Sequence, residues 1–245
     1  MKTENKVEEF YQKLGRPPGR FPLTRRQQDV LSDKKWLEFL KLSRFFRQLP
    51  FIEFVLGAGS LALGNARRDS DFDVIVGVKS DRIFTARFFC ILMFDLLGRR
   101  RQKFSHREAA SDKICFNHFI APTAYCLRPP YNIYWQELYK NLVPIYGQRD
   151  KIQEFFKANG WMERPVYFDD SRHQFHRPNF GGIFWENVLS GRFGDSIERL
   201  LKQIQIRRIE KSLKESAGFK PRLIFNDEEL EFHPDTLRID KLINQ

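Results

Sequence analysis

The stretch Phe54-Val-Leu-Gly-Ala-Gly-Ser-Leu-Ala-Leu-Gly-Asn-Ala-Arg-Arg-Asp-Ser-Asp-Phe-Asp-Val-Ile-Val-Gly-Val78 decides the fold of this chain. It contains an apolar run, a turn of small residues and a second apolar run that carries two carboxylates. Because side chains alternate along a strand, Asp71 and Asp73 point to the same side and Phe72 points away. The stretch therefore predicts two strands, 51–57 and 72–78, joined by a short helix over 60–66.

The paired aspartates predict a divalent ion. Two like charges on an apolar strand are costly to bury unless a cation or a strong donor compensates them. Mg²⁺ held by carboxylates and by substrate phosphates is the usual compensation. We therefore expect Mg²⁺ or Mn²⁺ as cofactor, with Asp71 and Asp73 as its ligands.

The turn before the acidic strand has the composition of a phosphate-binding loop. An apolar run ends at Gly57-Ala58-Gly59-Ser60, and the residues that follow can start a short helix. Free backbone N–H groups and the Ser60 hydroxyl would then face an incoming phosphate. Gly59 leaves room for that approach because it has no side chain. Gly59 and Ser60 are the expected phosphate-binding residues.

Together these residues resemble the signature of the nucleotidyltransferase superfamily, the fold of DNA polymerase beta, in which Gly-Ser is followed by Asp-hydrophobic-Asp-hydrophobic. Here Gly59-Ser60 is followed, after residues 61–70, by Asp71-Phe72-Asp73-Val74. The resemblance implies an α/β (α+β) fold with a small mixed sheet flanked by helices. The residues alone also allow an ordinary αβ unit, with Asp71 capping a turn and Asp73 paired with an arginine.

Superfamily members that transfer nucleotides add a third carboxylate from a later strand. The next strand is expected over 113–121, and Asn117 lies at its middle. An amide oxygen can ligate Mg²⁺ but carries no charge and cannot act as a base. Asn117 is therefore a candidate catalytic residue that puts catalysis in doubt, and His118 is expected on the other face of the strand. Three other acids are less suitable substitutes. Asp112 lies in the same strand region but alternation places it on the opposite face from Asn117. Asp95 lies on the preceding helix, and Glu53 lies on the first strand.

Two functions follow from this pattern. The first is Mg²⁺-dependent in-line transfer of a nucleoside monophosphate from a nucleoside triphosphate to a hydroxyl acceptor. The second is a catalytically weakened nucleotidyltransferase-fold protein that binds nucleotide or RNA, or acts as a regulatory partner. The net charge of +11 favours an anionic partner, and RNA is one candidate acceptor. The sequence does not identify the acceptor.

Composition indicates a soluble globular protein, with 42% hydrophobic and 30% charged residues. Cys90, Cys115 and Cys126 have no paired spacing and lie in apolar contexts, so we expect reduced core residues of a cytoplasmic protein. The charged N-terminus lacks an apolar signal region. The most apolar stretch, 88–97, is too short to span a bilayer and contains an aspartate, so stable membrane insertion is not expected.

Three regions are predicted along the chain. Residues 1–50 form an arm and a helix that packs on the core, residues 51–128 form the nucleotidyltransferase-like core, and residues 129–245 are mainly helical. The boundary is placed at Pro129-Pro130, because consecutive prolines resist both helix and central strand. Helical spacing predicts helices over 25–49, 81–97, 131–143, 151–158 and 195–216.

Overall fold

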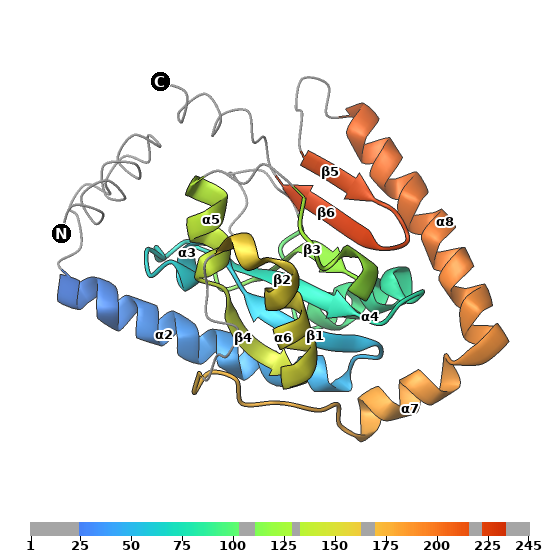
Figure 1. Ribbon diagram of the computed structural model, residues 1–245, viewed down its shortest axis with the longest axis horizontal. Helices are drawn as coiled ribbons and strands as arrows, with labels where there is room; N and C mark the ends of the chain where they lie inside the picture. Colours follow the sequence, from blue (N-terminus) through green and yellow to red (C-terminus); the bar gives the residue numbers. More distant parts are fainter. Residues whose placement is uncertain (1–24, 103–110, 129–132, 163–169, 216–221, 234–245) are drawn as a thin grey trace.

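The stretch 54–78 forms the centre of a six-stranded mixed sheet with the strand order β4-β1-β2-β3-β6-β5 (Figure 1). The computed structural model describes residues 25–102, 111–128, 133–162, 170–215 and 222–233. The predicted mixed α/β architecture is confirmed, with helices on both faces of the sheet. The predicted arm over 1–23 lies outside the described residues.

The core elements follow the predicted order. They are β1 (Ile52–Gly57), α3 (Gly59–Ala62), β2 (Phe72–Val78), α4 (Ile83–Leu96) and β3 (Ile114–Ile120). Strand β1 pairs antiparallel with β2, and β2 pairs parallel with β3. A parallel pair needs a crossover connection, and α4 is the helix of that connection. The helix predicted over 25–49 forms as α2 (Arg25–Ser43) and the 3₁₀ helix η1 (Arg44–Gln48).

The region after residue 129 also contributes strands to this sheet. Strand β4 (Val143–Gly147) pairs with β1, and β6 (Glu229–His233) pairs with β3 and with the edge strand β5 (Arg222–Phe225), all antiparallel. These three strands were not predicted. The remaining helices are α5 (Ile133–Lys140), α6 (Arg149–Ala158), α7 (Phe180–Val188), α8 (Gly191–Glu215) and the 3₁₀ helices η2 (Pro122–Ala124) and η3 (Gly160–Met162).

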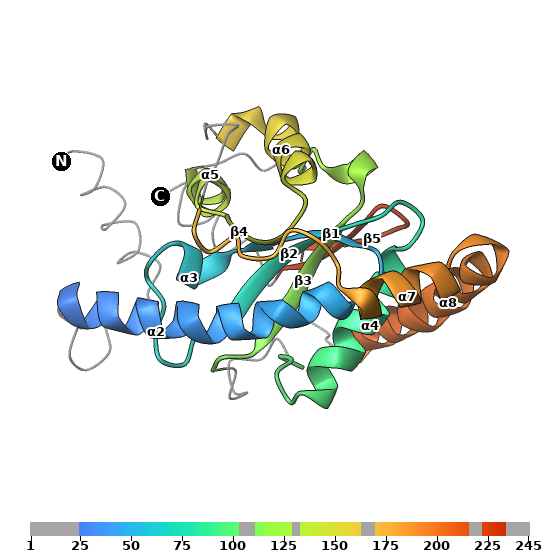
Figure 2. The same cartoon turned by 90° about the horizontal axis from the view of Figure 1, so that it is seen from below.

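Figure 2 shows the helices in two layers, with α5 and α6 on one face of the sheet and α2, α4 and α8 on the other. The alternation along β2 separates the two hydrophobic clusters. Phe72, Val74 and Val76 belong to the cluster on the side of α2 and α4. Ile75 belongs to the cluster under α5 and α6. Because side chains alternate, Asp71 and Asp73 share the face of Ile75.

A bulge in β3 changes which residues face the acidic strand. Asp73 is paired with Cys115, whereas Ile75 is paired with His118, so β3 has one extra residue between these two pairs. Paired residues on neighbouring strands point to the same face. His118 therefore lies on the face of Ile75, and the prediction that it points to the other face from Asn117 was wrong. The parity rule failed because it assumes a regular strand.

The expectations about membrane insertion and about the three cysteines can be compared with the structure. None of the helices within the described ranges combines the length and the apolarity that a membrane crossing requires. Cys90 and Cys115 are buried, as predicted, and neither forms a disulfide. Cys126 is exposed, so the prediction of three core cysteines was wrong for that residue. Its apolar neighbours in sequence lie on a connection between elements rather than inside one.

Candidate functional site

The acid pair lies at the start of β2, and each carboxylate has a donor from another element. Arg101 donates from Nη1 to Oδ2 of Asp71 at 2.5 Å. Asn117 on β3 donates from Nδ2 to Oδ1 of Asp73 at 3.2 Å. The thiol of Cys115, the cross-strand partner of Asp73, lies with both carboxylates so that one ligand atom of each is within 4.8 Å of the others. The place expected for a third carboxylate therefore holds a thiol and an amide.

Two pKa shifts describe the electrostatics of this cluster. Burial acts to lower the pKa of Arg101, but the ion pair and hydrogen bond with Asp71 outweigh it and raise the pKa. Burial, followed by the charges of Asp73 and Asp71, raises the pKa of the Cys115 thiol well above its ordinary value. Cys115 is therefore a protonated thiol at neutral pH and a poor metal ligand in that form. Arg101 compensates part of the charge of the acid pair.

The Gly-Ser turn packs directly against the acid pair. Gly59 has a φ of 67°, and a Cβ atom at this position would overlap with Oδ2 and Cγ of Asp73. The backbone N–H of Ala58 donates to the carbonyl oxygen of Asp73 at 2.9 Å. Only glycine combines this backbone conformation with so close an approach. The turn and the acidic strand thus form one local unit.

Ser60 connects the turn to the residue that precedes the acid pair. Its hydroxyl donates to the hydroxyl of Ser70 at 3.2 Å, and Ser70 also accepts from the backbone N–H of Arg67 at 2.9 Å. The hydroxyl of Ser60 therefore already has a partner, which a phosphate oxygen would have to replace. Gly59 and Asn117 both contact the carboxylate of Asp73, whereas Ser60 follows Gly59 in the chain and bonds to Ser70 instead.

The acid pair fits one divalent ion. Two carboxylates are hard oxygen ligands, and the amide oxygen of Asn117 is a third donor of the same kind. A bound ion would have to replace Arg101 at Asp71, since both compensate the same charge. A second ion would lack a third carboxylate in the described part of the site. The chemistry of the donors therefore favours a single Mg²⁺ or Mn²⁺.

The three substitute acids are engaged elsewhere. Asp112 accepts from Lys35, Asp95 accepts from Arg100, and Glu53 accepts from the hydroxyl of Tyr125, at 2.9, 2.7 and 2.8 Å. Burial raises the pKa of Glu53, although the bond from Tyr125 acts in the opposite direction. These partners give each acid a structural role. None of the three is the third carboxylate of the acid pair in this arrangement.

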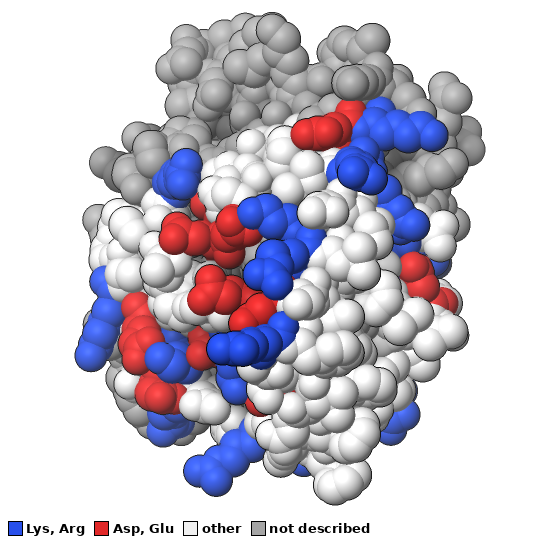
Figure 3. Space-filling model, turned by 90° about the vertical axis from the view of Figure 1, so that its right-hand side faces the viewer, with Lys and Arg blue, Asp and Glu red and all other residues white. Residues whose placement is uncertain are grey.

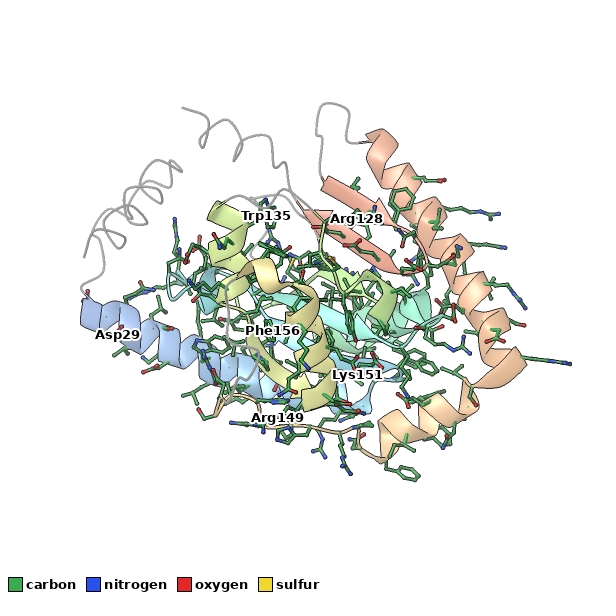
Figure 4. The ribbon with its side chains drawn as sticks, viewed as in Figure 1. Asp29, Arg128, Trp135, Arg149, Lys151 and Phe156 are labelled. Atoms are coloured by element: carbon green, nitrogen blue, oxygen red, sulfur yellow. The ribbon has the colours of Figure 1, made fainter. Side chains whose placement is uncertain are left out.

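Sequence reasoning missed a second polar cluster on the same sheet face. His118, Glu229 and Glu231 are almost fully buried, and Nε2 of His118 lies 3.1 Å from Oε1 of Glu229. Nε of Arg128 is 3.6 Å from the other oxygen of Glu229, and Figure 4 shows Arg128 beside β6. The alternation Glu229-Leu230-Glu231-Phe232 was the available signal, but its two glutamates are typical of an exposed face. Here they join β6 to β3.

A cleft of about 610 Å³ lies away from the acid pair. Its lining residues are Gln148, Arg149, Asp150, His176 and Arg177. It begins beyond Gly147, which pairs with Phe54, whereas the acid pair adjoins the opposite end of β1, where Gly57 pairs with Val74. The cleft therefore does not provide a substrate pocket for the two aspartates.

The acid pair, its packed glycine turn and the neighbouring amide are chemically suited to hold a hard cation together with phosphate oxygens. They lack a group that could accept a proton as a third carboxylate would. Comparisons of the chain with models of known families, with curated proteins and with solved structures found no match.

Proposed function

We propose that this protein is a nucleotidyltransferase that transfers a nucleoside monophosphate from a nucleoside triphosphate to a hydroxyl acceptor. One observation carries the proposal: Gly59 packs on the same Asp73 carboxylate that accepts a hydrogen bond from Asn117 of the next strand. The glycine turn and a residue of the next strand thus converge on the same carboxylate. An ordinary αβ unit has no need for a left-handed glycine against a carboxylate.

Each residue has a role in this proposal. Asp71 and Asp73 hold one Mg²⁺ or Mn²⁺, and the ion neutralises charge on the transferred phosphoryl group and orients it. Gly59 and Ser60 bind the distal phosphates through the backbone and the hydroxyl. Arg101 leaves Asp71 and contacts a phosphate, since a guanidinium is cationic at neutral pH with or without a carboxylate partner. The acceptor, RNA or another molecule, approaches from outside these residues.

A second function is favoured by the residues that stand where a third carboxylate is expected. Cys115 and Asn117 replace a carboxylate there, and Arg101 neutralises Asp71 without any ion. A protein with these substitutions would bind nucleotide or RNA with little transfer, or act as a regulatory partner. The two functions share the ligand and differ in whether a covalent product forms. A cytoplasmic location stays a prediction under both.

The deciding experiment measures binding and transfer on the same samples. The protein is incubated with each α-labelled nucleoside triphosphate, Mg²⁺ or Mn²⁺ and cell extract, and labelled RNA, protein and small molecules are separated. We expect Mg²⁺-dependent labelling that Asp73→Asn abolishes. The matched control is Asp69→Asn, because Asp69 is exposed and pairs with Arg67 in the same loop.

Three outcomes are distinguished. Labelling that is lost in Asp73→Asn but kept in Asp69→Asn supports transfer at this site. Mg²⁺-dependent nucleotide binding without any labelled product supports the weakened, binding function instead. Equal nucleotide affinity of the wild type and Asp73→Asn, measured by calorimetry, contradicts both functions because it excludes the acid pair as the nucleotide site.

A further inference from the structure

Five aromatic rings form a continuous cluster at the surface across α4 and α7. Phe88 contacts Phe89 with ring centroids 5.6 Å apart, and Phe89 contacts Trp185 of α7 at 5.4 Å. Trp185 contacts Phe184 at 5.5 Å, and Phe184 contacts Phe180 at 6.4 Å. We call these five residues the aromatic patch. Phe180 is 84% exposed and Phe184 48% exposed, and Phe88 and Trp185 are also exposed, whereas Phe89 is partly buried and packs against the core.

The aromatic patch continues along α4. Leu92 and Leu96 follow Phe88 at intervals of four residues, so the three form one exposed stripe on that helix. Figure 3 shows a broad uncharged area in the lower right of the face that it presents, with both basic and acidic residues near its border. Exposed apolar areas of this extent mark interaction sites in soluble proteins. We therefore expect this surface to bind a partner.

The charge beside the aromatic patch is positive. Helix α8 starts three residues after α7 ends, and its exposed positions include Arg192, Arg199, Arg207, Arg208 and Lys211. Two nearby acids are paired: Asp195 with Arg82 at 2.6 Å, and Glu186 with Lys79 at 2.8 Å. Glu198 accepts hydrogen bonds from the backbone N–H groups of Phe84 and Thr85 at 2.8 Å. Glu210 is an exposed acid in the second half of α8. The exposed basic residues of α8 therefore outnumber its exposed acids.

We propose that the aromatic patch and the exposed arginines of α8 bind the surface of an anionic lipid bilayer. Phenylalanine and tryptophan side chains enter the boundary between headgroups and acyl chains, and basic side chains beside them contact anionic headgroups. Such a helix lies on the membrane and does not span it. A second copy of the chain is a weaker candidate occupant, since two copies with a net charge of +11 repel each other.

The test is flotation with vesicles of phosphatidylcholine alone or mixed with phosphatidylserine. We expect binding to the mixed vesicles, weaker binding at high salt, and a loss of about tenfold for each of Phe180→Ser and Phe184→Ser. Phe180 is the more exposed side chain, so Phe180→Ser should keep the wild-type melting temperature, and a melting curve checks that Phe184→Ser is folded before its binding is compared. The control is Leu37→Ser, because Leu37 is an exposed apolar residue of α2, outside the aromatic patch.

Several results would overturn the proposal. They are failure to bind mixed vesicles, equal binding to neutral vesicles, or an equal loss in Leu37→Ser. A dimer in sedimentation velocity that Phe184→Ser dissociates would assign the surface to a second copy instead. Asp73→Asn should bind vesicles as the wild type does. Membrane binding can therefore fail or succeed independently of the nucleotidyltransferase proposal.

Discussion

Arg101 occupies the position of a cation at Asp71. Its guanidinium donates to the carboxylate at 2.5 Å, and the backbone N–H of Arg101 donates to the carbonyl oxygen of Ile114 at 2.9 Å. The second bond anchors the arginine beside the start of β3. An internal cation of this kind stabilises the acid pair without metal. It also competes with a divalent ion for the same carboxylate.

Removing this competitor should strengthen metal binding. Arg101→Gln eliminates the positive charge, so we expect the affinity for Mg²⁺ alone to rise by about fivefold or more. The affinity for Mg²⁺-ATP should rise less or fall, because the variant lacks a cation for the phosphates. Calorimetry with each ligand measures both, with Arg100→Gln as control, since Arg100 pairs with Asp95. A weaker affinity for Mg²⁺ alone would contradict competition.

The variant Asn117→Asp places a carboxylate where the third acid is expected, and its stability is compared with and without metal. The new carboxylate would face Asp73, to which Asn117 now donates at 3.2 Å. In the presence of EDTA we expect a loss of about 1 to 3 kcal/mol in the free energy of unfolding, because like charges repel. Added Mg²⁺ should restore it and raise any transfer rate. Thermal unfolding with and without Mg²⁺ measures this, and a variant that Mg²⁺ does not rescue would place Asn117 outside the metal site.

At the scale of residues, the contacts within the local unit could be predicted from spacing, whereas the contacts with residues distant in sequence could not. Gly59, Asp71 and Asp73 lie within one strand-turn-strand unit, so their contact follows from short-range geometry. Arg101 reaches Asp71 from the connection after α4, and no pattern in the sequence assigns it that partner. Cys115 belongs to the site because it is the cross-strand partner of Asp73. Predicting this would have required the register between β2 and β3.

At the scale of elements, the turn between β1 and α3 can be tested by a glycine comparison. Gly59 and Gly64 both have left-handed backbones, with φ of 67° and 71°. A Cβ at Gly59 overlaps with Asp73, whereas nothing lies within 4 Å of one at Gly64. Gly59→Ala should therefore cost more than about 2 kcal/mol in the free energy of unfolding, and Gly64→Ala only about 1 kcal/mol.

Urea unfolding of the two glycine variants measures this difference. The strain of the backbone is common to both, so the excess in Gly59→Ala reports the contact with Asp73. Combining Gly59→Ala with Asp73→Ala should recover part of that excess because the overlapping carboxylate is gone. Equal losses in the two single variants would indicate that the turn does not pack on the acid pair.

The central strands and the periodic helices were predictable, whereas β4, β5 and β6 were not. Apolar runs such as 51–57 and 72–78 have the length and composition of buried strands. Strand β4 contains a proline, and only its first residue, Val143, lies in the helix predicted over 131–143; the observed helix α5 ends at Lys140. Strand β6 alternates glutamate with apolar residues, a pattern that favours an exposed edge. Glu229 can be buried because His118 and Arg128 supply partners from outside the strand.

At the scale of the whole molecule, the sheet continues across the predicted boundary at residue 129. Strand β4 covers the free edge of β1, and β6 covers the free edge of β3. The cluster under α5 and α6 combines residues from both sides of the boundary, among them Phe54, Ile75, Trp135 and Phe155. The first half of the chain therefore depends on the second half for two strand edges and for parts of both hydrophobic clusters.

This dependence predicts that residues 1–128 do not fold alone. The fragment would expose the edges of β1 and β3 and the apolar face that α5 and α6 cover, a combination that favours aggregation over a cooperative native state. We expect no sharp thermal transition by near-ultraviolet circular dichroism, in contrast to the full chain. Co-expression of residues 1–128 with residues 129–245 should restore a transition, because β4 and β6 can then pair with their partners. A cooperative transition of residues 1–128 alone would show instead that the predicted core is an independent unit, and that the strands from the second half extend a sheet that is already stable.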